Sequence, residues 1–78
     1  MKIRVVSVKA GRDKNKLMAV VDETEKSMLL CDGKERPLER PKRKNIKHIA
    51  PTDYEINRED LHSNRSLRKA LHECSKHS

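Results

Sequence analysis

The first half of the chain alternates between short apolar runs and polar turns. β-Branched residues are concentrated in residues 3–8 and 17–21, and this composition predicts a strand in each segment. Residues 27–31 form a third apolar run, which a polar turn at residues 23–26 separates from the second. This half of the chain therefore predicts β structure.

The dipeptide Asp32-Gly33 predicts a tight hairpin turn after the third strand. A type I′ turn needs a positive φ at both central residues, and Asp-Gly is one of the pairs that favour it. We expect residues 35–38 to return antiparallel to the third strand. Because Pro37 and Pro41 cannot donate ladder hydrogen bonds, this returning strand is expected to be short and to lie at an edge.

A last short strand is expected at residues 46–49. Ile46 and Ile49 are its apolar anchors, and Pro51 is expected to end it. Five short strands with tight turns and no crossover helix predict a mainly β domain. We expect a small antiparallel barrel over residues 1–52.

Residues 53–78 contain no glycine and are expected to form a C-terminal helical extension that packs on the barrel. Asn57 and Asp60 resemble a capping pair, which predicts a helical turn near residues 58–62. A longer α-helix is expected near residues 65–75, because apolar residues recur there on one helical face.

Leu67 and Leu71 are the residues through which this helix is expected to pack on the barrel. A helix of this length owes most of its stability to such packing. Docking of the helix also accounts for the first strand, which is apolar on both faces. Its apolar positions are Ile3 and Val5 on one face, and Val6 and Val8 on the other.

The chain of 78 residues is highly charged and basic. Hydrophobic residues make up 33% of it, so we expect one small domain with a modest core. The net charge of +7 makes a polyanion the expected partner. An anionic membrane is the competing polyanion, but no segment has the apolar length of a bilayer span. Cys31 and Cys74 form no disulfide framework, so a reduced, cytoplasmic location is expected.

Two basic segments carry the candidate binding residues, and the first surrounds the turn after the first strand. Its candidate residues are Lys9, Gly11, Arg12, Lys14, Asn15 and Lys16. Glycine and asparagine tolerate the left-handed backbone that such a turn needs. A basic turn at the end of a strand presents N–H groups and lysines to a phosphate backbone. The alternative is an ordinary solvated turn.

The second basic segment spans residues 34–47, where cations greatly outnumber acids. The cations are Lys34, Arg36, Arg40, Lys42, Arg43, Lys44 and Lys47, and the acids are Glu35 and Glu39. Like charges at this density repel one another unless a polyanion compensates them, which favours nucleic acid as the partner. A nuclear-localisation signal at residues 41–44 is the alternative.

Three stretches of the chain together resemble a KOW domain. They are Val8–Lys16, Asp32–Lys34 and Arg40–Ile49. The resemblance covers residues 1 to about 52 and is closest to the KOW barrels of archaeal and eukaryotic large-subunit ribosomal proteins and their short bacterial relatives. It implies an SH3-like barrel, ribosomal RNA as the partner, a role in translation, no cofactor and no enzymatic activity. Asn15 stands where the family usually has a second loop glycine.

The basic segments and the resemblance together assign the RNA-binding residues. To the loop residues they add Arg40, Lys42, Arg43, Lys44, Asn45, Lys47 and His48. Tyr54 is the only aromatic residue, so no stacking platform for single-stranded bases is expected. Recognition is therefore expected to rest on phosphates, sugars and the shape of folded RNA.

Catalytic and metal sites are not expected. His72, Cys74 and His77 cluster near the C-terminus without the spacing of a zinc site. No nucleophile or orienting acid accompanies His48. The competing function class is a protein-interaction module, like the KOW domains of transcription elongation factors, that contacts transcription or ribosomal proteins. In both cases we expect a monomer.

Overall fold

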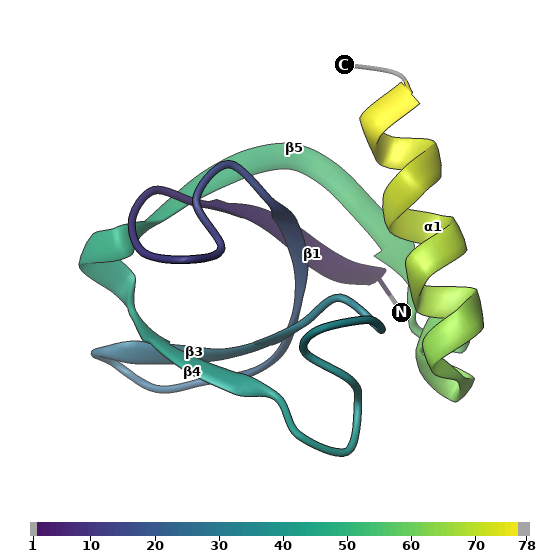
Figure 1. The fold of residues 1–78 in the computed structure, drawn as a ribbon, viewed down its shortest axis with the longest axis horizontal. Coiled ribbons are helices and arrows are strands. Elements are labelled where there is room, and N and C mark those ends of the chain that lie inside the picture. Colours follow the sequence, from purple (N-terminus) through teal and green to yellow (C-terminus); the bar gives the residue numbers. More distant parts are fainter. Residues whose placement is uncertain (1, 77–78) are drawn as a thin grey trace.

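The computed structural model describes residues 2–76, which form a curved antiparallel sheet with a helix packed against it (Figure 1). The strands are β1 (Lys2–Val8), β2 (Leu17–Glu23), β3 (Ser27–Cys31), β4 (Lys42–Asn45) and β5 (Ile49–Asn57). Their order in the sheet is β4-β3-β2-β1-β5, and all neighbours are antiparallel. The mainly β class with a C-terminal helix is confirmed, and so are the first three predicted strands.

The sheet curls without closing into a complete barrel. β4 and β5 are its two edges, and within residues 2–76 no ladder of hydrogen bonds joins them. The 3₁₀ turn η1 (Ile46–His48) connects these two strands along the chain. The ring-like path of the strands in Figure 1 is therefore an open, barrel-like sheet.

The returning strand predicted at residues 35–38 is wrong. Residues 32–41 form a loop of turns and bends, and the strand that pairs with β3 is β4. In that pairing Leu30 lies opposite Lys42, so the hairpin needs a ten-residue connection instead of a two-residue turn.

Asp32 gives the physical reason for this longer loop. Its carboxylate accepts hydrogen bonds from the backbone N–H groups of Lys34 and Arg36, each at 2.9 Å. Such local bonds satisfy backbone donors that a strand ladder would otherwise use. Gly33 has a φ of +80°, but Asp32 has no positive φ, so the predicted type I′ turn is also wrong.

The strand predicted at residues 46–49 is displaced along the chain. Its first three residues form η1, where Asn45 accepts a hydrogen bond from the Lys47 N–H at 2.9 Å. β5 then runs through Pro51, which was expected to end the strand, and continues beyond residue 52. An edge strand tolerates proline, because one side of its backbone needs no ladder partner.

The sheet carries a buried apolar cluster on each face. One lies beneath the helix and contains Val5, Ala19, Cys31, Ile56, Leu67 and Leu71. The other contains Val6, Val8, Met18, Val20, Leu30 and Ile49. Val5 and Val6 are adjacent on β1 yet belong to different clusters, because successive side chains of a strand point to opposite faces. The expectation that the first strand is apolar on both faces is confirmed.

Only one of the two apolar anchors predicted at residues 46–49 is buried. Ile49 is buried as expected, whereas Ile46, the other predicted anchor, lies on η1 and is 41% exposed.

Cys31 lies in the cluster beneath α1, where burial raises the pKa of its thiol to about 11. This thiol therefore stays protonated near neutral pH and packs as a small apolar side chain.

The helical turn predicted near residues 58–62 and the helix predicted near residues 65–75 are both present, whereas residues 53–57, which were expected in the helical extension, belong to β5. The turn is the 3₁₀ turn η2 (Arg58–His62), and the helix is α1 (Asn64–Lys76). The Asp60 carboxylate accepts a hydrogen bond from the Asn57 N–H at 3.1 Å, which confirms the expected contact between these residues. The Ser63 hydroxyl accepts a hydrogen bond from the Ser66 N–H at 3.1 Å and so caps the start of α1. No described helix is long and apolar enough to cross a membrane.

The docking of α1 on the sheet is confirmed for both predicted residues. Leu67 is fully buried and Leu71 is 6% exposed, and both belong to the cluster that includes residues of β1, β2, β3 and β5. Figure 1 shows α1 beside the end of β5. The helix thus covers one face of the sheet.

We expect Leu67→Ala to lower the free energy of unfolding by about 2 to 4 kcal/mol, because truncation leaves a cavity under the helix. Arg65→Ala, at an exposed position of the same helix, is the matched control and should change it little. Urea denaturation measures both variants. Equal stability of the two would mean that α1 does not support the sheet.

Candidate nucleic-acid interface

The first basic segment is the loop between β1 and β2. Two backbone hydrogen bonds close its base, from the Asn15 N–H to the Val8 carbonyl at 2.7 Å and from the Val8 N–H to the Lys16 carbonyl at 3.1 Å. Gly11 and Asn15 have φ values of +88° and +70°. The expected left-handed positions are confirmed, and asparagine serves at the second because it tolerates this conformation better than most side chains.

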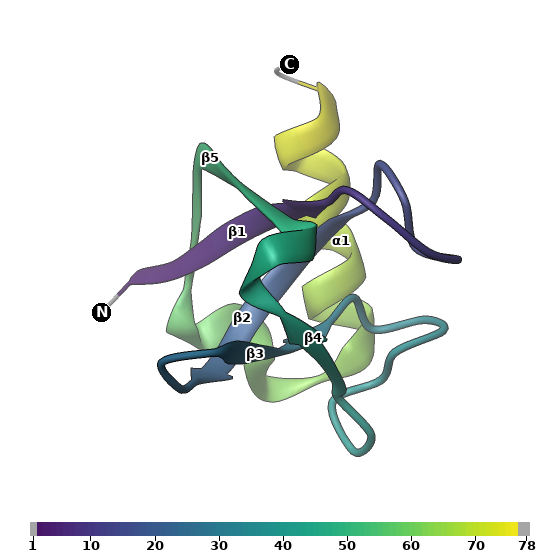
Figure 2. The same cartoon turned by 90° about the vertical axis from the view of Figure 1, so that its left-hand side faces the viewer.

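A buried carboxylate holds this loop in place. Asp13 is 1% exposed, and its Oδ2 accepts a hydrogen bond from Arg36 Nε at 3.2 Å. Lys16 Nζ lies 3.7 Å from Oδ1, which accepts no hydrogen bond within the described residues. Figure 2 shows that the loops of residues 9–16 and 32–41 project on the same side of the molecule. The ion pair of Asp13 with Arg36 ties these two loops together.

The sequence reasoning missed Asp13 as a functional position. The available signal was a single acid within a run of cations, since Asp13 stands between Arg12 and Lys14. An acid in that position is readily taken for a solvated turn residue. Its burial depends on Arg36, which is 23 positions away in the chain.

The structure places the two basic segments side by side. The Lys9 N–H donates to the His48 carbonyl at 2.7 Å, and Lys44 Nζ donates to the Ala10 carbonyl at 3.3 Å. A Cβ atom at Gly11 would lie only 2.8 Å from Lys44 Nζ. In Figure 1 the loop, in dark purple, accordingly lies next to η1. The loop, β4 and η1 therefore form one continuous surface, which we call the basic surface.

Most candidate residues on the basic surface are exposed. These are Lys9, Gly11, Arg12, Lys14, Asn15, Lys42, Asn45, Lys47 and His48; Arg40 and Arg43 are also exposed but lie apart from them. Lys16 and Lys44 are partly buried, and both are engaged in the contacts that hold the loop. The sequence thus identified two structural lysines as binding residues along with the exposed ones.

Two candidates in the second segment lie apart from the rest. Arg40 is in the turn before β4, where its N–H donates to the Pro37 carbonyl at 2.9 Å, and no described contact links it to the first loop. Arg43 donates to the Ser27 hydroxyl at 2.9 Å. Because strand side chains alternate, Arg43 points to the opposite face of β4 from Lys42 and Lys44.

The acidic groups near the basic surface are already engaged. Glu35 accepts a hydrogen bond from Lys16 at 2.9 Å, which raises the pKa of Lys16 and lowers that of Glu35. Glu39 accepts a hydrogen bond from the Asn64 amide at 2.8 Å, and Asp13 is buried against Arg36. Within residues 2–76, no exposed cation of the two basic segments forms an ion pair. Their charge is therefore available to a ligand.

No protein-family model matches this chain, and no curated protein is similar enough to count as a relative. Among residues 2–76, no three His, Cys, Asp or Glu side chains come together as a metal-binding group. His77, part of the His and Cys cluster considered above, lies outside the described residues.

Removal of the buried carboxylate should loosen the basic loop. We expect Asp13→Ala to lower the free energy of unfolding by about 2 kcal/mol, because the partly buried Arg36 guanidinium loses its charged acceptor. Thermal or urea denaturation measures this loss, and amide hydrogen exchange of residues 9–16 should become faster. Glu25→Ala, at an exposed acid in another turn, is the control and should leave the free energy of unfolding and the exchange rates of residues 9–16 unchanged. Unchanged exchange in Asp13→Ala would show that the loop is held by other contacts.

Proposed function

We propose that this protein is a KOW-type RNA-binding module that contacts the phosphate backbone of folded RNA, with ribosomal RNA as its natural partner. The observation that carries the proposal is the meeting of the two basic segments, through the bonds from Lys9 to His48 and from Lys44 to Ala10. The same segments carry the KOW resemblance in the sequence. A ribosome-bound role in the cytoplasm agrees with both.

The arrangement of charge favours phosphates as the ligand. Lysine and arginine side chains neutralise phosphates and release the counterions that surround a nucleic acid. Within residues 2–76, the exposed cations of the basic surface have no acidic partner, so they can take this role without first breaking an ion pair. The curved sheet holds Lys9, Lys14, Lys42 and Lys47 on adjoining elements, which suits a surface that follows one backbone.

The position of the only aromatic residue also favours recognition of backbone and shape. Tyr54 lies on β5 and packs, partly buried, against the cluster beneath α1. Proteins that bind single-stranded bases generally stack them on exposed aromatic rings. No other aromatic side chain is present in the sequence, so stacked bases have no platform on the basic surface.

One partly apolar hollow is the observation that supports the alternative, a protein-interaction module. This hollow has a volume of about 380 Å³, and Met28, Ile46, Ile49 and Pro51 line it together with the charged residues Arg4, Glu23 and Glu25. Ile46 is the only large hydrophobic residue in the described chain that is strongly exposed. Stable protein interfaces usually bury about 800 Å² on each partner, which one isoleucine does not approach. RNA is therefore the function that the geometry supports best.

Salt dependence provides a direct test of phosphate binding. If about five phosphates are neutralised, log K for a folded RNA hairpin should fall with log salt with a slope of about −4 to −5. Arg12→Gln and Lys14→Gln should each reduce that slope by about one. Lys69→Gln removes the same charge from an exposed position on α1 and should leave the slope unchanged. An affinity that hardly responds to salt would favour the protein-interaction alternative.

Association with ribosomes is tested by sedimentation of a cell extract. We expect the protein to co-sediment with ribosomal particles at low salt and to leave them at high salt, because counterion release weakens phosphate contacts. The double variant Arg12→Gln/Lys14→Gln should leave the ribosomal particles at a lower salt concentration than the wild-type protein. Co-sedimentation that persists in high salt, for the wild-type protein and this variant alike, would instead indicate contacts with ribosomal proteins.

A further inference from the structure

A second basic feature lies beside the basic surface, in a groove between α1 and the two loops. The groove has a volume of about 460 Å³. Its charged lining consists of Lys16, Lys34, Arg68 and Asp32, and His72 also lines it. None of the groove residues on α1 was a candidate from the sequence, where the helix was expected only to support the sheet.

The groove forms because the loop of residues 32–41 comes close to α1. Gly33 is buried with a φ of +80°, and a Cβ atom on it would collide with the backbone carbonyl of Asn64. The same Cβ atom would lie 3.1 Å from Arg68 Cγ. Only a residue without a side chain lets the loop sit this near the helix. The neighbouring Lys34 and Arg68 are thereby brought to the same groove.

The groove is continuous with the basic surface. Asn15 and Lys16 belong to the loop between β1 and β2 and also line the groove. Arg68 and His72 are exposed and stand four positions apart on α1, so they share one flank of the helix. A ligand that lies on the loop between β1 and β2 can therefore extend into the groove without crossing another element.

The charges in the groove favour an anionic ligand. Lys16, Lys34 and Arg68 face a single acid in the lining, Asp32. The Asp32 carboxylate already accepts two backbone hydrogen bonds within its own turn. Within residues 2–76, neither Lys34 nor Arg68 forms an ion pair. Lys34 and Arg68 are thus available to an anionic ligand in the groove.

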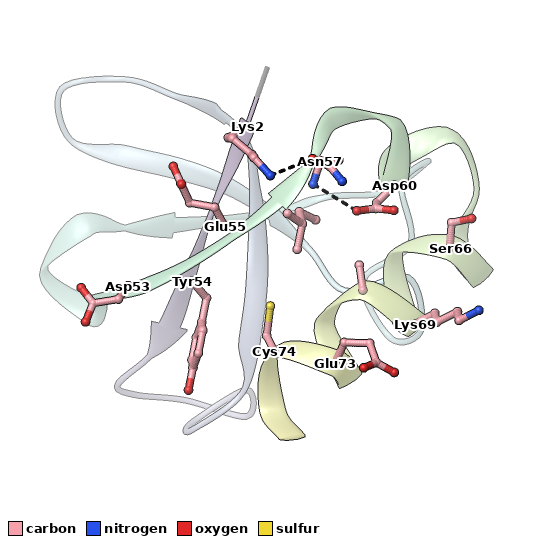
Figure 3. Close-up of a pocket in the computed structure, with 12 residues that line it drawn as sticks. Lys2, Asp53, Tyr54, Glu55, Asn57, Asp60, Ser66, Lys69, Glu73 and Cys74 are labelled. Atoms are coloured by element: carbon pink, nitrogen blue, oxygen red, sulfur yellow. Dashed lines mark hydrogen bonds between the residues drawn. The ribbon is translucent and has the colours of Figure 1, made fainter. Parts of the chain in front are cut away.

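The opposite flank of α1 has the reverse charge. A groove of about 640 Å³ between β5 and α1 is lined by Asp53, Glu55, Asp60 and Glu73, against Lys2 and Lys69 (Figure 3). An anionic chain is disfavoured there, because acids outnumber cations. Arg68 and Lys69 are adjacent in sequence but line grooves of opposite sign. The helix therefore offers RNA one flank only.

We propose that RNA held on the basic surface continues into the groove beside α1, where Lys34 and Arg68 contact a phosphate and His72 lies within the same contact region. This inference rests on the proposed function and extends it to the helix. The apolar residues Leu17 and Leu71 also line the groove and offer no polar atom to a base edge. The contact is therefore one of charge and shape, without sequence readout.

The test compares Arg68→Gln with Lys69→Gln, which remove the same charge from adjacent exposed positions. With a folded RNA hairpin as the probe, Arg68→Gln should reduce the slope of log K against log salt by about one, and Lys69→Gln should leave it unchanged. In the wild-type protein, the same RNA should shift the NMR signals of the Arg68 side chain and the His72 ring. Melting curves of both variants establish that the fold is intact.

The outcomes separate this inference from the proposed function. If Arg12→Gln reduces the slope and Arg68→Gln does not, the groove carries no RNA and the basic surface still does. Equal reductions in Arg68→Gln and Lys69→Gln would show a general effect of net charge and overturn the groove contact. If poly-glutamate shifts the Arg68 and His72 signals and RNA does not, the groove binds an acidic protein segment. Absence of RNA binding by the wild-type protein would overturn the proposed function itself.

Discussion

The central strands are apolar on both faces, and the rest of the molecule is arranged around this constraint. Val5 and Val6 on β1 belong to two separate buried clusters, one on each side of the sheet. Leu67 and Leu71 of α1 cover one side, and the curl of the sheet itself covers the other. Because burial of apolar surface is the main favourable contribution to folding, neither cover is dispensable in so small a domain. Polar and charged residues are concentrated in the loops, in η1 and in the edge strand β4, which is where the candidate interface lies.

Polar contacts, in contrast, hold the loop that carries the cations. The Asp13 carboxylate joins it to the loop of residues 32–41 through Arg36, and Lys44 joins it to β4 through the Ala10 carbonyl. Each contact uses a charged group that would otherwise stand on the surface. The remaining cations keep their charge for a ligand, because Glu35 and Glu39 are engaged elsewhere. These contacts thus hold the loop of the basic surface in place and occupy the nearby acidic groups, so that the exposed cations give the surface its positive charge.

The helix α1 contributes both to the buried core and to the charge of the molecular surface. Its apolar face covers the sheet, and its two flanks border grooves of opposite charge. A polyanion that approaches the molecule is attracted to the flank with Arg68 and repelled from the flank with Glu73. Under the proposed function, this asymmetry gives the RNA a direction across the protein, from the loop of residues 9–16 to the helix.

The sequence by itself determined the features that depend on neighbours in the chain. The β-branched runs predicted β1 to β3, the leucine spacing predicted α1, and Gly11 and Asn15 were expected in left-handed backbone because few other residues adopt it. The loop at residues 32–41 and the 3₁₀ turn at residues 46–48 have local hydrogen bonds from backbone N–H groups to the side chains of Asp32 and Asn45, which the pattern of apolar runs did not reveal. Only the tertiary structure decided the burial of Asp13 and the groove beside Arg68. In each of these two cases the deciding group is distant in sequence: Arg36 is the partner of Asp13, and Gly33 allows the approach to α1. Local sequence patterns do not predict these contacts, because the residues come together only when the sheet and the helix have packed.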